Sequence, residues 1–503
     1  MVAAVTAYLC LIITLLAVAT YAFYITYLTP VKSINAYISA KKTQTPWALG
    51  WCMFASGVGS WALYAFPDTA VQVGSWGIIG YWLSIVLGYA VLAFAGPAIA
   101  EELGDGVTLS DYAGNRFGSA QKFYVLLIAL FYQLISIAAE LTAIGSLMVL
   151  LAPDVSKTWA IILVSVITCA YTLFGGIKAS IATDAVKGGF VLLLVVIICI
   201  AAFSYTTLPA NAFESTGIAS FTTIGFEAVF TLTIAVVSSN LFLTGFWLRT
   251  FAAKNDADLR KACAYAALAS TPFIVLLGVV GFMGYIMHPE APVFDGGFFF
   301  YILLDMPEGW SILVLIVVAA LVSSTADTIQ TGMSAEILSN FQDRLSLPFA
   351  RVISIIINIP AIFIALTDTS VLKLFLIADL LCAATVGPIF LGIWNRTHPT
   401  AVLAGCVSGL LTIFFSGVSR NGKFVDGFNE FVLEEGLFTT HSMVLFILTL
   451  VIPVIVTVGL TFILPPAPKR SVPKNGNNEL LVEAPVNHSS EHPYEASKSP
   501  AVV

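Results

Sequence analysis

Long apolar runs alternate with short polar segments over most of this chain. Runs of about 18 apolar residues or more indicate helices that can cross a lipid bilayer. About thirteen such runs predict an all-α, polytopic membrane protein with a transmembrane domain over residues 1–464. The predicted spans are Ala4 to Leu28, Trp47 to Phe66, Trp76 to Phe94, Phe123 to Leu151, Trp159 to Lys178, Val186 to Tyr205, Ala228 to Phe246, Ala264 to Met287, Trp310 to Ile329, Val352 to Leu366, Val371 to Trp394, Ala401 to Phe415 and Met443 to Leu464.

The charge distribution predicts how the two termini lie. Lys and Arg concentrate in the cytoplasmic loops of membrane proteins. With the carboxyl terminus inside, all of the 22 basic residues except Lys157, Lys373, Arg420 and Lys423 fall on the cytoplasmic side. We therefore expect an extracellular amino terminus and a cytoplasmic carboxyl terminus. The last residues, 465–503, are rich in Pro, Ser, Asn and Glu, which predicts a disordered cytoplasmic tail.

Composition excludes several classes of protein. The chain is 58% hydrophobic and only 10% charged, whereas an ordinary soluble domain has about 25% charged residues. The basic surface that nucleic-acid binding requires is missing. The seven cysteines and five histidines have no disulfide or metal-ligand spacing, and no P-loop is found. We expect no enzyme, no cofactor and no ATP-driven pump.

Two predicted spans contain helix-weakening polar runs at matching places. The second span reads Ala-Ser-Gly-Val-Gly-Ser-Trp over Ala55–Trp61, and the seventh reads Val-Ser-Ser-Asn over Val237–Asn240. Interrupted helices at corresponding places in two halves point to a site built from inverted repeats. The repeats would cover residues of about 46–205 and 226–395. A packing face of small residues is the alternative explanation.

The ninth span carries the clearest candidate chemistry. Residues at positions i, i+3 and i+4 share one helix face, so the carbonyl of Ala320 and the hydroxyls of Ser323 and Ser324 converge. A break in the second span would add free carbonyls at Ala55 and Val58. Neutral oxygens of this kind suit an alkali cation that must bind and leave again. Serines that bond back to the preceding turn or join two helices are the alternative.

Several further segments, together with the ninth-span run Ala320–Thr331, carry a resemblance to a known family. They are Thr108-Leu109-Ser110-Asp111-Tyr112, Asn115-Arg116-Phe117-Gly118, Tyr171-Thr172-Leu173-Phe174-Gly175-Gly176-Ile177-Lys178-Ala179, Thr183-Asp184, Lys187-Gly188, Trp247-Leu248-Arg249 and Ala252-Ala253-Lys254. Together they resemble the sodium/solute symporter family, which includes carriers of proline, pantothenate, sugars, iodide and urea. The resemblance extends over about Trp47 to Trp394.

This resemblance implies a leucine-transporter-type fold of inverted five-helix repeats, with a sodium ion between the second and ninth spans. The implied sodium ligands are the residues that the spacing already indicates, namely the carbonyls of Ala55, Val58 and Ala320 and the hydroxyls of Ser323 and Ser324. One position departs from the pattern of the proline carriers. Where they have an acidic residue, this chain has Gly57, which leaves the choice between sodium and a proton open.

Aromatic and amide side chains beside the two breaks are candidates for a solute cavity. The family resemblance implies that aromatics here line the cavity and its outer gate, although packing or interfacial anchoring explains each of them equally well. No Lys or Arg is expected at cavity depth, which favours a neutral or zwitterionic solute. The candidates are Trp61, Tyr64, Trp82, Ser239 and Asn240, with Phe66 and Tyr81 nearby.

Three carboxylates lie within or at the edge of predicted spans. A carboxylate at the bilayer centre costs about 2.5–3.5 kcal/mol, so each one requires a partner or a role. Asp327 lies one turn after the ion serines and is expected to be structural or part of the ion path. Glu140 is a candidate proton or solute site, with a buried, hydrogen-bonded acid as the alternative, and Asp379 opens the eleventh span.

The combined pattern predicts a plasma-membrane secondary symporter. Inward sodium flux, or a proton in its place, would drive uptake of a small polar solute by alternating access, and urea-like or proline-like solutes are favoured. Its partners would be the solute, sodium and the lipid bilayer. A passive channel for a small neutral solute and a nutrient sensor that no longer transports are the alternatives.

Overall fold

The computed structural model of the chain describes residues 2–291, 297–340, 345–367, 371–433 and 435–465. The predicted disordered tail therefore lies outside the described residues, apart from its first residue. Within them the regular structure is helical, with one isolated bridge between Gln44 and Ala253. The helices in chain order are α1 (Ala4–Leu28), α2 (Ile34–Ile38), α3 (Pro46–Gly57), α4 (Ala62–Val73), α5 (Ser75–Leu103), α6 (Leu109–Phe117), α7 (Ser119–Leu151), α8 (Lys157–Tyr205), α9 (Ala212–Thr216), α10 (Thr223–Asn240), α11 (Thr244–Thr250), α12 (Asp256–Met287), α13 (Phe298–Leu304), α14 (Glu308–Leu338), α15 (Leu347–Ile356), α16 (Ile359–Ala365), α17 (Val371–Phe390), η1 (Leu391–Ile393), α18 (Pro399–Asn421), α19 (Asp426–Asn429), η2 (Glu430–Val432) and α20 (Thr440–Ile463).

Eleven helical stretches in the described residues are long and apolar enough to cross a membrane. This number treats α8 as one span, although non-helical backbone at Gly176 divides it into two helices. It also leaves out α3 and α4, which are too short individually. The multi-pass architecture is therefore present, and the total of about thirteen spans stays a prediction.

Gly176 sets the direction of the second half of α8. Its φ of 54° lies in the left-handed region, which residues with a Cβ rarely adopt. A Cβ here would also collide with the carbonyl oxygen of Tyr37. Both constraints explain why the Gly175-Gly176 pair stands at this point, and the kink aims the residues that follow it at α14.

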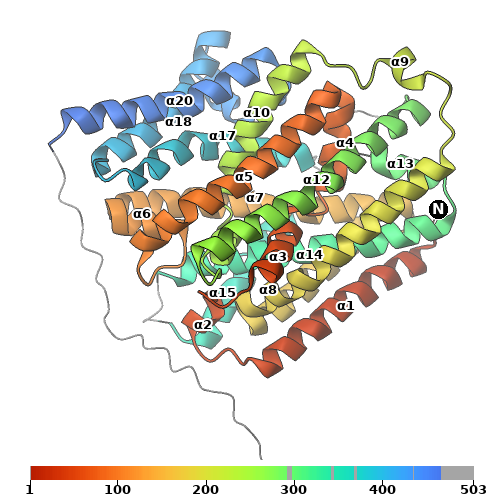
Figure 1. The fold of residues 1–503 in the computed structure, drawn as a ribbon, viewed down its shortest axis with the longest axis horizontal. Coiled ribbons are helices and arrows are strands. Elements are labelled where there is room, and N and C mark those ends of the chain that lie inside the picture. Colours follow the sequence, from red (N-terminus) through yellow and green to blue (C-terminus); the bar gives the residue numbers. More distant parts are fainter. Residues whose placement is uncertain (1, 292–296, 341–344, 368–370, 434, 466–503) are drawn as a thin grey trace, which may run out of the picture.

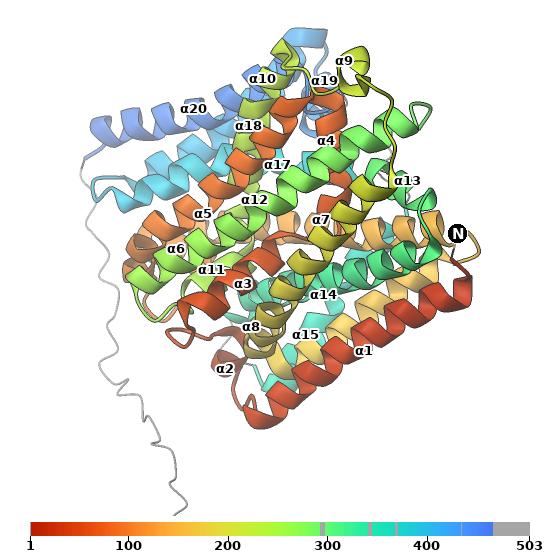
Figure 2. The ribbon, with the colours of Figure 1, turned by 45° about the vertical axis from the view of Figure 1, so that its right-hand side comes forward.

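The helices form a bundle with α14 near its centre and α1 and α20 at opposite edges (Figures 1 and 2). The most apolar window of α14 is 83% buried, whereas that of α1 is 22% buried. Exposed apolar side chains on α1 and α20 are suited to contact with lipid. The polar residues of α14 can therefore be satisfied only by other parts of the protein.

Both predicted helix interruptions are present. The helix α3 ends at Gly57, Val58 is extended (φ −113°, ψ 97°), and α4 begins at Ala62. The helix α10 ends at Asn240, and α11 begins at Thr244. Each break leaves backbone groups free of helical bonds, which a protein buries only where they meet a partner or a cavity.

The short helix α6 fastens one end of the bundle. Thr108 and Asp111 form a capping box at its start. Near its end, the Arg116 guanidinium donates to the carbonyl oxygens of Gly392 (2.9 Å), Trp394 (3.3 Å) and Asn395 (3.1 Å), just after α17. The Arg116 side chain and Gly392 are both buried, whereas Trp394 and Asn395 are exposed, so the carbonyl of Gly392 is the acceptor that water cannot replace.

We expect Arg116→Ala to destabilise the protein by about 1–3 kcal/mol because it leaves the buried carbonyl of Gly392 unsatisfied. The measurement is the melting temperature of the purified protein in detergent. Arg260→Ala is the matched control, since this exposed guanidinium only overlies the ring of Phe94. Equal melting temperatures for the two variants would show that α6 is not fastened by Arg116.

Candidate functional site

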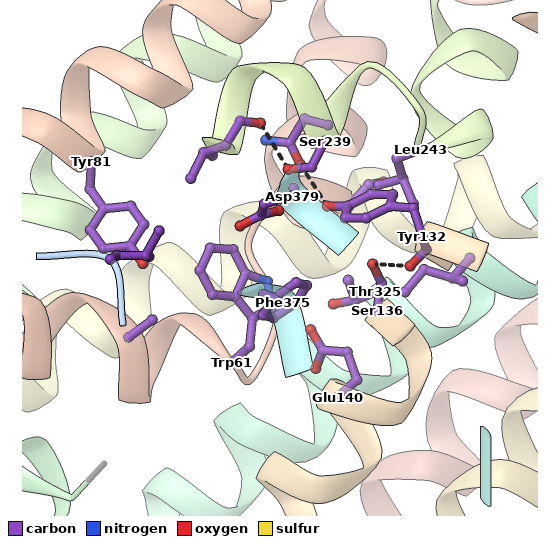
Figure 3. Close-up of a pocket in the computed structure, with 17 residues that line it drawn as sticks. Trp61, Tyr81, Tyr132, Ser136, Glu140, Ser239, Leu243, Thr325, Phe375 and Asp379 are labelled. Carbon is purple, nitrogen blue, oxygen red and sulfur yellow. Dashed lines mark hydrogen bonds between the residues drawn. The ribbon is translucent and has the colours of Figure 1, made fainter. Parts of the chain in front are cut away.

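A cavity lies where the two helix breaks meet α7, α14 and α17 (Figure 3). Its described lining combines aromatic rings, small polar groups and two carboxyl groups, and contains no Lys, Arg or His. The lining residues are Ser56, Gly57, Trp61, Ala65, Tyr81, Tyr132, Ser136, Glu140, Val236, Ser239, Asn240, Leu243, Thr325, Ile329, Phe375, Asp379 and Leu437.

Glu140 of α7 is fully buried at one side of the cavity. Its Oε2 accepts hydrogen bonds from the backbone N–H of Ser60 (3.0 Å) and from the Ser60 hydroxyl (2.5 Å), which lie in the α3–α4 break. Its Oε1 has no hydrogen-bond partner within the described residues. One oxygen of the carboxyl group therefore holds the break in place, and the other remains available.

Gly59 makes room for this carboxyl group. A Cβ at position 59 would collide with Oε1 of Glu140 and lie 2.6 Å from the hydroxyl oxygen of Thr325. The break thus passes so close to α7 and α14 that only glycine fits.

Asp379 of α17 is also buried and lines the cavity. In the view of Figure 3, the rings of Trp61 and Phe375 lie between the carboxyl groups of Asp379 and Glu140. These two rings contact each other edge to face, with 5.5 Å between centroids. The cavity therefore has an aromatic wall between two acidic ends.

The structure places some predicted cavity residues in the lining and others outside it. Trp61, Ser239 and Asn240 line the cavity. Tyr64 instead donates to the carbonyl oxygen of Ala143 (3.1 Å). Trp82 is 37% exposed on the outside of α5, and its indole N–H donates to Thr271 (3.1 Å). Neither Tyr64 nor Trp82 belongs to the described lining.

The predicted ion serines lie on the buried face of α14. The Ser323 hydroxyl donates to the carbonyl oxygen of Ala320 (2.8 Å). This is the bond to the preceding turn that the alternative explanation predicts. A hydroxyl that donates in this way still offers lone pairs to a cation. The Ser324 hydroxyl donates to Oδ1 of Asp184 (2.5 Å), on the second half of α8.

Asp184 also connects the two spans that were predicted to hold the ion. Its Oδ2 accepts a hydrogen bond from Ser56 of α3 (3.0 Å). Ala55 lies just before Ser56, and Val58 follows the last residue of α3, where a helix leaves its last carbonyls without helical partners. The oxygens available here, from hydroxyls, carbonyls and a carboxylate, fit the preference of a sodium ion.

Gly57 has no room for the acidic side chain found in proline carriers. Its Cβ would lie 2.8 Å from the hydroxyl oxygen of Tyr89 and 3.2 Å from Cζ of Phe246. Any charge for the ion site must therefore come from elsewhere, and Asp184 is a carboxylate that accepts hydrogen bonds from both Ser56 and Ser324.

Four buried charged residues form a network beside the ion serines. Asp184 pairs with Lys187 (3.0 Å) and with Arg249 of α11 (2.6 Å), and Lys187 also pairs with Asp327 of α14 (3.2 Å). Asp327 accepts further hydrogen bonds from Ser180 (2.6 Å) and from the Tyr171 hydroxyl (2.8 Å). The position of Asp327 agrees with a structural or ion-path role.

This network corrects one expectation from the sequence. The predicted topology puts Lys187 and Arg249 in cytoplasmic loops, whereas the structure has them within α8 and α11, where they are 5% and 0% exposed. The spacing of Asp184 and Lys187, three residues apart inside an apolar stretch, is the signal that could have identified a buried ion pair. Neither basic residue lines the cavity.

The profile of the sodium:solute symporter family matches residues 37–288. The chain belongs to this family. Membership confirms the resemblance seen in the sequence motifs and makes the protein a symporter rather than an enzyme. A small solute, sodium and the lipid bilayer are its partners.

Individual relatives agree with the assignment to the sodium:solute symporter family. The chain is 29% identical to a spermidine transporter of Candida albicans over 81% of its own length and 79% of the relative. It is 23% identical to an osmoregulated proline transporter of Bacillus subtilis, over 80% and 87% of the two chains. A Na+-coupled sialic acid symporter, solved in a substrate-bound outward-open state, superposes with a TM-score of 0.72 at 17% identity, over 92% and 99%. This likeness confirms the fold class.

We expect Gly59→Ala to destabilise the protein by about 1–3 kcal/mol, because the added methyl group overpacks the space held by Glu140. Melting temperatures in detergent measure the effect. Gly88→Ala is the control, since a Cβ at this position meets nothing within 4 Å. Combining Gly59→Ala with Glu140→Ala should cost less than the sum of the two single changes, because the colliding group is gone. Strict additivity would contradict the proposed close approach.

Proposed function

We propose that this protein takes up a small organic cation, of the polyamine type, together with sodium. The observation that carries the proposal is the cavity itself, whose described lining has two buried carboxyl groups and no basic residue. A positively charged solute would supply the counter-charge that the lining lacks.

Charge and aromatic surface both favour an ammonium solute. A carboxylate without a counter-charge is costly inside a membrane protein, and an ammonium group would meet both Oε1 of Glu140 and the carboxyl group of Asp379. The rings of Trp61, Tyr81 and Phe375 add faces that attract organic cations, worth about 0.5–2 kcal/mol for each favourable contact.

The arrangement of these groups favours a solute with two or more amines. Acidic ends with aromatic rings between them match the alternation of ammonium groups and apolar methylenes in a polyamine (Figure 3). The name of the Candida albicans relative, a spermidine transporter, agrees with this class.

Urea and proline, which the sequence favours, fit the lining less well. Urea brings no charge to Glu140 and Asp379. Proline brings an ammonium group and also a carboxylate, for which the described lining offers no basic partner.

The coupling ion in this proposal binds at the carbonyls of Ala55, Val58 and Ala320 and the hydroxyls of Ser323 and Ser324. Ion binding holds the end of α3 against α14 and so fixes the break that carries Ser60 and Trp61. Release of the ion toward the cytoplasm frees the two helices to separate. Each sodium ion that moves inward through about 100 mV supplies about 2.3 kcal/mol.

The proposed setting is the plasma membrane, with the amino terminus outside, the carboxyl terminus inside and the transmembrane domain over residues 1–464. In support, the amino terminus and the end of α20 lie at opposite ends of the bundle (Figure 1), as an odd number of crossings requires. The basic residues in the predicted cytoplasmic loops supply the direction.

We expect Asp379→Asn to reduce spermidine uptake by about tenfold or more, because hydrogen bonds to a charged group contribute about 1.5–3 kcal/mol each. The measurement is sodium-driven uptake of radiolabelled spermidine, urea and proline into proteoliposomes. Asp154→Asn, at an exposed position, is the control. Uptake of urea or proline without uptake of spermidine would contradict the proposed solute class.

Ser323→Ala combined with Ser324→Ala should abolish the sodium dependence of uptake, because two ligand oxygens of the ion are removed. Uptake rates are measured with sodium replaced by choline, and at two pH values to detect a proton in its place. The matched control is Ser416→Ala with Ser419→Ala on α18. If the first pair keeps its sodium dependence, the ion site is elsewhere.

A further inference from the structure

The buried charge network beside the ion serines contains two basic residues with different contacts. Arg249 donates to Asp184 (2.6 Å), Ser180 (2.8 Å) and Thr328 (2.7 Å), and also to Cys52 and to the carbonyl oxygen of Gly245. Its planar guanidinium therefore joins α3, α8, α11 and α14 by directed bonds. This geometry is typical of a structural clamp.

Lys187 is different, because the contacts of its ammonium group within the described residues are with two carboxylates. Nζ lies 3.0 Å from Oδ1 of Asp184 and 3.2 Å from Oδ2 of Asp327. A flexible ammonium group in such a place acts as a compact point charge. Its distances to the two oxygens are those of ion pairs, so one ammonium group offsets the charge of both acids.

The charges of the network balance only while this ammonium group is present. Asp184 and Asp327 contribute two negative charges, and Lys187 and Arg249 contribute two positive charges. Without the ammonium group, one carboxylate charge would remain uncompensated among the hydroxyls of Ser180 and Ser324, which hydrogen-bond to these acids. Carboxylate and hydroxyl oxygens are hard ligands, as sodium and lithium prefer.

We infer that Lys187 is a tethered cation that fills a second cation site formed by Asp184 and Asp327. A free ion that bound there in its absence would make the same charge contacts, but it would have to be carried from the medium. The covalently held charge thus reduces by one the number of ions that the transporter must bind in each cycle.

The position of Lys187 connects this role to the first ion site. Asp184 is the acid that hydrogen-bonds both Ser324 of α14 and Ser56 of α3. A permanent positive charge 3.0 Å from Asp184 offsets the attraction of this carboxylate for sodium at the serines. Lys187 therefore keeps sodium binding weak enough for release. The inference rests on the proposed sodium coupling, but it is independent of which solute is carried.

The test is the thermal stability of purified, solute-free protein in sodium, lithium or choline chloride at constant ionic strength. We expect sodium or lithium to stabilise Lys187→Met relative to choline, because one buried charge is left uncompensated. The ion concentration at which this stabilisation saturates should be about tenfold or more lower than in the unmodified protein. Lys178→Met, on the same helix and partly exposed, is the control and should behave as the unmodified protein does.

A second variant separates ion binding from general damage. Lys187→Met with Asp327→Asn restores the charge balance, so it should lose the gained stabilisation. A Lys187→Met protein whose stability responds to sodium no more strongly than the unmodified protein would overturn the inference. So would a gain that persists in the double variant.

Should Lys187→Met fail to fold, Asp327→Asn alone remains decisive. It leaves an excess positive charge at Lys187, so the sodium concentration for half-maximal stabilisation should rise by about tenfold. An unchanged value would overturn the inference. Because no solute is present, these outcomes are distinct from a failure of the proposed polyamine uptake.

Discussion

The rest of the structure depends on the hydrogen bonds and ion pairs made by the carboxylate of Asp184. It is fully buried and receives Ser56 from α3, Lys187 from its own helix, Arg249 from α11 and Ser324 from α14. Its two basic partners compensate its charge, and the loss of either one leaves a buried charge uncompensated. The two broken helices are thereby tied to α8 and α14 through one residue.

The α3–α4 break connects Asp184 to the cavity. Within six residues, Ser56 contacts Asp184, Ser60 contacts Glu140, and Trp61 forms the aromatic wall. Only Gly57, Val58 and Gly59 separate Ser56 from Ser60 along the chain. The ion site and the solute cavity are therefore two ends of one short segment.

The sequence alone predicts the helical fold and both breaks, because apolar runs and clusters of Gly and Ser act locally. It also indicates Trp61, Ser239, Asn240 and Glu140 near the cavity. The spacing of Asp184 and Lys187 could have indicated their own ion pair, but it could not reveal the contacts with Arg249 and Asp327, because these partners lie on other helices. The placement of Trp82 outside the lining likewise depends on how α5 is rotated about its axis, which an almost uniformly apolar sequence leaves undetermined.

The spacing of Asp184 and Lys187 also bears on how the chain enters the membrane. Helices are inserted during synthesis in chain order, so the second half of α8 reaches the bilayer before α11 and α14 exist. Because the two residues are one helical turn apart and form an ion pair within the same helix, they carry no net charge into the lipid at that stage. Asp327, synthesised later, enters on a helix that can meet Lys187 already in position. The ion pair thus allows a helix with two charged residues to enter the membrane without exposing an unpaired charge to the lipid.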